Sequence, residues 1–194
     1  MLLARLCSVD RLSFNTLATS EDIRSAFKAK GHDFPRNHKT VKQKVWQHYD
    51  SVKAEAKEKI AKIVASGGRF SISVDEYTSK KNRRYMVLNL HDGTSVVTCL
   101  GLIRVHGSMP AEKAAEKTRK RLLEFGLNVQ DHIFGVVSDG ARIMLKYARL
   151  LGIEHQICHS HGLHLAVCDV IYKSSLNGGK FELMENRSND LHLL

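Results

Sequence analysis

The sequence predicts an α/β protein in which a mixed five-stranded sheet follows an N-terminal helical segment. Three observations support this prediction. Apolar residues recur at helical spacing through the first third of the 194 residues, strand-like runs begin at residue 69, and helical and strand patterns alternate from residue 108 onward. The resulting order, β-β-β-α-β-α-β-α, places three antiparallel strands before crossover helices and parallel strands, so we expect helices on both faces of the sheet.

The helical segment is expected to span residues 1–68. Ser20 is a candidate N-cap for a short helix that Gly31 ends, and a longer helix is predicted over residues 38–66, before a Gly-Gly pair. Its apolar positions recur every three or four residues, at Val41, Val45, Tyr49, Val52, Ala56, Ile60 and Val64. The lysine-rich opposite face is either simply solvated or lies along a phosphate backbone, with Lys42, Lys53 and Lys57 as candidate nucleic-acid contacts.

The strand-containing core is expected over residues 69–173. Apolar runs predict strands over 70–75, 85–91, 95–105, 133–138 and 155–158, with Asp92-Gly93 as a hairpin turn between the second and third. Helical patterns cover 108–126, 141–150 and 160–172. The polar residues 174–194 show no pattern and are expected to form a loose tail.

The charge balance indicates the class of partner. Thirty Lys and Arg against twenty Asp and Glu give a net charge of +10 and a pI near 9.6, which favours polyanions, and DNA leads among them. A basic surface with no partner is the alternative. No apolar run approaches the roughly 20 residues of a membrane span. The four cysteines have irregular spacing, so reduced thiols are expected rather than a disulfide scaffold.

Two strands of the predicted sheet end in a carboxylate. Val74 precedes Asp75 on the first strand and Ser138 precedes Asp139 on the fourth, and these strands would be parallel neighbours at the centre of the sheet. Sites form beyond the carboxyl ends of such strands, and paired aspartates suit hard divalent cations. Strand period two puts Asp75, rather than Glu76, on the face of the two preceding serines. The alternative is that each aspartate caps a strand end or a helix, as Asp139 could cap the helix that follows it.

The segment HQICHSHGLHLAVC has a second possible chemistry. His161, His164 and Cys168 share helical spacing, with Cys158 just before them, and zinc favours such ligands. All four lie in one chain segment, however, whereas structural zinc sites usually draw pairs from two. Packing or hydrogen bonding without metal is therefore the preferred interpretation, and zinc is not expected.

Four motifs in order, SVDEYTS, YMVLNLHDG, GVVSDGARIM and CHSHGLHLAVCDVIY, resemble the catalytic core of hAT-superfamily DNA transposases over residues 12–172. The resemblance implies a ribonuclease-H-like fold, DNA as substrate, Mg²⁺ or Mn²⁺, and a triad of two aspartates and a glutamate. Asp75 and Asp139 match the two aspartates, and Cys158 and His161 match a CxxH motif of the family. The leading helices resemble the segment between the family's zinc finger and its core.

The sequence also departs from the family pattern. Tyr77 stands where a tryptophan is usual, Gly140 where asparagine is common, and Arg142 where a small polar residue is usual. The family places its third acid after a large helical insertion and oligomerises through a further C-terminal region. Neither has room before residue 194, and Glu182 and Glu185 are not expected to replace the glutamate.

The sequence therefore predicts a truncated hAT-type transposase catalytic domain that is inactive alone. The alternatives are a domesticated, non-catalytic DNA- or protein-binding module and a truncated gene product without activity. A nuclear location is expected from the implied DNA substrate.

Overall fold

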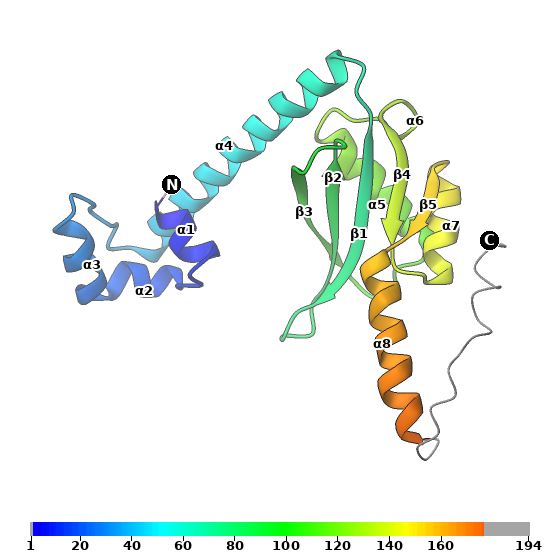
Figure 1. Ribbon diagram of the computed structural model, residues 1–194. Helices are drawn as coiled ribbons and strands as arrows, with labels where there is room; N and C mark the ends of the chain where they lie inside the picture. Colours follow the sequence, from blue (N-terminus) through cyan, green and yellow to red (C-terminus); the bar gives the residue numbers. More distant parts are fainter. Residues whose placement is uncertain (1, 177–194) are drawn as a thin grey trace. The chain divides into compact units, whose positions relative to one another are not determined.

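The computed structural model describes residues 2–176, with side chains described as far as residue 171 (Figure 1). The chain divides into two compact units, Met1–Gly67 and Gly68–Leu194. Among the helices of the described residues, none combines the length and the apolar character needed to cross a membrane.

The N-terminal unit contains the helices α1 (Leu2–Ser8), α2 (Phe14–Thr19), α3 (Glu21–Lys28) and α4 (His38–Ala65). Side-chain caps begin three of them, since Ser13, Ser20 and Asn37 each accept a hydrogen bond from a first-turn backbone N–H. The small core consists of Leu17, Ala18, Phe34 and Val41. The short helix after Ser20 and the long helix lie where the sequence predicts them, whereas α1 and α2 are too short for a clear helical period.

The apolar stripe of α4 is only partly buried. Val41 and Ile60 are buried, but Tyr49 and Val52 are 44% and 47% exposed. The cause within this unit is length: 28 residues of helix extend about 42 Å, whereas α2, which packs on α4, has only six residues. The periodic pattern therefore predicted the helix correctly but overstated its core.

The second unit is built on one sheet. Its elements are β1 (Phe70–Thr78), β2 (Arg84–His91), β3 (Val97–Val105), α5 (Ala111–Leu123), α6 (Val129–His132), β4 (Ile133–Ser138), α7 (Arg142–Leu151), β5 (Glu154–Ile157) and α8 (His159–Leu176). The strand order is β3-β2-β1-β4-β5, with β1, β2 and β3 antiparallel and β4 and β5 parallel to β1 (Figure 1). This confirms the predicted mixed, ribonuclease-H-like sheet flanked by helices, with β1 and β4 as parallel central neighbours.

Helices α5 and α7 cover one face of this sheet. That face carries the core, whose strand residues include Phe70, Ile72, Val74, Leu88, Leu90, Leu100 and Val136. Arg121 of α5 donates to the Leu100 carbonyl, and Thr118 of α5 bonds to Tyr147 of α7. The core side of the sheet is therefore the side that Phe70, Ile72 and Val74 of β1 face, as period two predicts.

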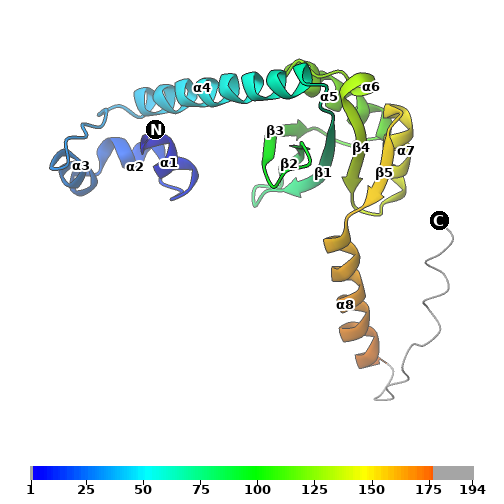
Figure 2. The ribbon, with the colours of Figure 1, turned by 45° about the horizontal axis from the view of Figure 1, so that its top comes forward.

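The opposite face lacks the helical cover that the sequence led us to expect within this unit. There Ser73 Oγ lies 2.9 Å from His91 Nε2 and also accepts from the Asn89 amide at 3.4 Å. Polar side chains of neighbouring strands thus satisfy the serine, and no covering helix packs on it among residues 68–176. The reason is the path of α8, which runs on beyond the end of β5 instead of folding back over the sheet (Figures 1 and 2).

Candidate functional site

Asp75 lies on β1 at the point where the strand loses one of its two neighbours. Pairing with β4 ends at Ser73, opposite Val137, whereas pairing with β2 continues through Thr78, opposite Arg84. The strand therefore extends past the predicted end at Asp75, because β2 supplies partners for three further residues. Asp75 is exposed, and its Oδ1 accepts a hydrogen bond of 2.8 Å from the Glu76 backbone N–H.

Asp139 follows the last residue of β4. It does not cap α7, since the N-cap position is Ala141, but its Oδ1 accepts from the Ala141 N–H at 3.4 Å. The preceding Ser138 is 2% exposed, donates to the Asp139 carbonyl and lies 2.9 Å from His155 Nε2. These contacts hold the chain at the end of β4 and leave the Asp139 carboxylate exposed.

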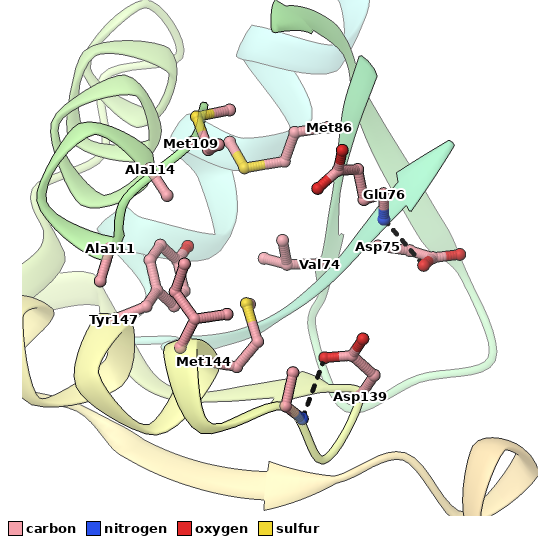
Figure 3. A pocket seen from close by; sticks show the side chains of 12 residues that line it. Val74, Asp75, Glu76, Met86, Met109, Ala111, Ala114, Asp139, Met144 and Tyr147 are labelled. Atoms are coloured by element: carbon pink, nitrogen blue, oxygen red, sulfur yellow. Dashed lines mark hydrogen bonds between the residues drawn. The ribbon is translucent and has the colours of Figure 1, made fainter. Parts of the chain in front are cut away.

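Both aspartates line one cavity of about 220 Å³ at the carboxyl ends of β1 and β4. Figure 3 shows Asp139 at the edge of this cavity, facing the apolar wall, and the Asp75 carboxylate on the other side of β1 from that wall. The other lining residues are Val74, Glu76, Met86, Met109, Ala111, Ala114, Ala141, Ile143, Met144 and Tyr147. The structure therefore brings together the two residues that the sequence singled out, from strands far apart along the chain.

Glu76 is a third acid at this cavity, although the strand pattern of the sequence favoured Asp75 over it. Its carboxylate accepts a hydrogen bond from Arg84 Nε, and Arg84 Nη1 also donates to the Gly107 carbonyl at 3.0 Å. The bond and the charge of Glu76 raise the pKa of the Arg84 guanidinium. Period two could have identified Glu76, because it places this residue on the same face as Val74, which lines the cavity.

The donor set suits a hard divalent cation. Mg²⁺ is commonly held by one or two carboxylates, with water and substrate phosphates completing its shell. Asp75 and Asp139 each use one carboxylate oxygen for a backbone N–H, which leaves the other oxygen available. No group of three or more His, Cys, Asp or Glu side chains in the described residues could hold an ion together. Asp75 and Asp139 are the candidate ligands at this cavity, and water and substrate oxygens would complete the shell of an ion held there.

The Cys and His motif lies beside this site. The Cys158 N–H donates to the Ser138 carbonyl at 2.8 Å, which ties the start of α8 to the end of β4. Cys158 and His161 are half-buried, and neither lines the cavity. On α8, His164 Nε2 and Cys168 Sγ lie 3.6 Å apart. These contacts give Cys158 a role in positioning the strand end that carries Asp139.

The remaining predicted residues lie elsewhere. Lys42 and Lys57 are exposed and Lys53 is half-buried on α4 of the N-terminal unit. Glu182 and Glu185 lie outside the described residues. Tyr77, at the position where the hAT pattern has tryptophan, is 52% exposed two residues after Asp75.

Comparison with known proteins gives structural matches only, since no family model and no curated protein sequence matches the chain. A chain of the simian T-cell lymphotropic virus intasome in complex with PP2A regulatory subunit B56 gamma matches with a TM-score of 0.32 and 14% identity, over 66% of this chain. This chain spans half of that intasome chain, as 50% of it is covered.

Two catalytic domains also match. The HTLV-2 integrase catalytic core domain, in complex with magnesium, has a TM-score of 0.29 and 12% identity over 60% of this chain and 77% of its own. The Mos1 transposase catalytic domain, with raltegravir and Mn, has a TM-score of 0.32 and 14% identity over 72% of this chain and 77% of its own. All these TM-scores are below 0.5, so the functional assignment rests on the strand order and side chains of this chain.

Proposed function

We propose that the chain carries a DNA-processing core of the hAT-transposase type, in which Asp75 and Asp139 hold Mg²⁺ or Mn²⁺. One observation carries the proposal: two aspartates distant in sequence line a single cavity at the carboxyl ends of two parallel strands. The hAT motifs and the net charge of +10 support DNA as the substrate. On this proposal the protein acts in the nucleus.

The residues of the site have separate tasks. Asp75 and Asp139 supply the oxygen ligands, and their backbone hydrogen bonds fix the orientation of both carboxylates. Methionine and alanine side chains form the apolar wall of the cavity. A divalent ion, when bound, would stabilise negative charge on a phosphodiester and lower the pKa of a bound water.

Glu76 limits what the site does alone. Its carboxylate is bonded to Arg84, so the acids left to bind an ion are Asp75 and Asp139. Cleavage with two metals needs ligands for both ions. We therefore propose that this chain binds DNA and a divalent ion but cleaves DNA poorly. The same ion pair favours the second candidate, a domesticated module that binds DNA or protein without cleaving.

The experiment compares the effect of Mn²⁺ on DNA affinity in the wild-type chain and in Asp75→Asn and Asp139→Asn. An ion shared by the carboxylates and a DNA phosphate binds more tightly in the complex than to the chain alone, so Mn²⁺ should tighten DNA binding by the wild type and not by either variant. An equal effect of Mn²⁺ on all three proteins would contradict the proposal.

Plasmid nicking then separates the two candidates. The wild type in Mg²⁺ or Mn²⁺ should nick supercoiled DNA little more than Asp75→Asn does. Nicking that Asp75→Asn abolishes would identify an active enzyme and exclude the non-catalytic module.

A further inference from the structure

The turn that joins β1 to β2 has the sequence SKKNRR, with four basic side chains in six residues. Its backbone is fixed: the Ser79 N–H donates to the Arg83 carbonyl at 2.8 Å, and the Asn82 N–H donates to the Ser79 carbonyl at 2.9 Å. Asn82 has φ of +53°, a left-handed conformation that asparagine adopts more readily than most residues. The turn therefore has a defined backbone conformation.

Three of the four cations in this turn are uncompensated. Arg84 is bonded to Glu76, but Lys80, Lys81 and Arg83 are exposed and make no ion pair within the described part of the chain. We call these three residues the basic arm. Like charges held so close repel one another, and a polyanion relieves that repulsion while releasing its own counterions. The geometry of the turn needs only Ser79 and Asn82, so the three charges are not required for folding.

The basic arm stands at a fixed distance from the cavity. β1 runs without a break from Asp75 through Thr78 to the turn, and Figure 1 shows this hairpin projecting beyond the end of β4. Four residues of strand extend about 13 Å, which matches about four base-pair steps of 3.4 Å along the axis of a DNA helix. A DNA strand that has one phosphate at Asp75 and Asp139 would therefore have another phosphate near the basic arm, a few nucleotides away.

The hairpin is braced at its base. Arg104 of β3 lies over the Tyr85 ring, with 5.2 Å between its guanidinium carbon and the ring centroid, and donates to the Tyr85 hydroxyl at 3.1 Å. Tyr85 pairs with Tyr77 across the hairpin. Because these contacts order the hairpin before it binds anything, little conformational freedom remains to be lost on binding.

We propose that the basic arm contacts the DNA phosphate backbone about four steps from the phosphodiester at Asp75 and Asp139. The proposal rests on the DNA-processing function proposed above and adds the surface that sets the position of the DNA over the site.

The test measures DNA affinity against salt concentration for the full chain and for Lys80→Ala/Lys81→Ala. Each phosphate contact contributes about 0.9 to the slope of log affinity against log salt. Because the variant lacks two such contacts, its slope should be shallower by about 1.8. Between about 50 and 200 mM salt, the wild type should then lose about twelvefold more affinity than the variant. The matched control is Lys117→Ala/Lys120→Ala, which removes the same charge from α5, a helix that covers the core face of the sheet.

The outcomes separate this proposal from the metal site. A loss of slope in Lys80→Ala/Lys81→Ala, absent from the α5 control and restored in Lys80→Arg/Lys81→Arg, supports the basic arm. Equal slopes in the arm variant and the control, or no DNA binding by the wild type, would overturn it. Mn²⁺ binding, followed by electron paramagnetic resonance in the same proteins, should be unchanged in the arm variant. If Asp75→Asn and Asp139→Asn still bound Mn²⁺ as the wild type does, the proposed metal site would be refuted. The conclusion from the salt dependence would be unaffected.

Discussion

The hydroxyl groups of Thr118 and Tyr147 lie 2.8 Å apart in a fully buried bond that joins α5 to α7. Tyr147 also lines the cavity that contains Asp75 and Asp139. The two helices begin at this cavity, with Ala111 of α5 and Ala141 at the start of α7 in its wall. A single buried bond therefore couples the packing of the covering helices to the shape of the site.

Removing the Tyr147 hydroxyl should destabilise the second unit without creating a cavity in its core. Tyr147→Phe keeps the ring but leaves the buried Thr118 hydroxyl without this partner, which should lower the free energy of unfolding by about 1–2 kcal/mol. Urea denaturation measures the change. Replacing both partners, in Tyr147→Phe/Thr118→Val, should cost less than the sum of the two single changes. Strictly additive costs would show that the two hydroxyls do not interact.

The same tyrosine predicts a loss of stability in alkali. Burial raises the pKa of the Tyr147 phenol above its usual value, and the bond to Thr118 opposes this only in part. An unfolded tyrosine ionises near pH 10, whereas folded Tyr147 keeps its proton. The contribution of protonated Tyr147 to the free energy of unfolding is therefore complete below about pH 10. It is lost as the pH rises toward the pKa of the folded state.

The comparison of wild type with Tyr147→Phe isolates this effect from other alkaline titrations. In urea denaturation from about pH 8 to about pH 11, the stability of the wild type should fall more steeply than that of the variant. Parallel pH profiles would mean that Tyr147 ionises as readily in the folded chain as in the unfolded one.

Arg84 should weaken metal binding by occupying Glu76. Arg84→Gln removes a positive charge near the cavity and frees the Glu76 carboxylate, so Mn²⁺ affinity should rise by about fivefold, or about 1 kcal/mol. Calorimetric titration with Mn²⁺ measures the change. The double variant Arg84→Gln/Glu76→Gln restores the local net charge and should bind Mn²⁺ close to the wild-type affinity. An increase that persists in the double variant would rule out Glu76 as its source.

The sequence predicted the sheet well because strand patterns and turn signals are local. The alternation of Phe70, Ile72 and Val74 with serines predicted β1 and its core face. The aspartates that follow the apolar runs of β1 and β4 are Asp75 and Asp139, which line one cavity. The length of β1 depended on a partner: the residues after Asp75 carry no apolar alternation, and they form strand because β2 pairs with them.

The features that the sequence did not predict arise from contacts between segments. The bond between Glu76 and Arg84 forms across a hairpin, and the uncovered face of the sheet depends on the direction in which α8 leaves β5. The cavity itself combines β1, β2, α5, α7 and the turn after β4, and no local pattern records such a combination. The CxxH motif was recognisable, but its contact with the end of β4 runs through the backbone of Cys158 and is not encoded by its side chain.

The central claim is that Asp75 and Asp139 together hold one divalent ion, and Mn²⁺ binding by the full chain tests it most directly. Electron paramagnetic resonance measures free Mn²⁺ during titration of the wild type, of Asp75→Asn, of Asp139→Asn and of Asp131→Asn, a control that removes an exposed acid from α6. We predict that each site variant weakens binding by roughly tenfold or more, while the control binds as the wild type does. Wild-type affinity in either Asp75→Asn or Asp139→Asn would contradict the shared site.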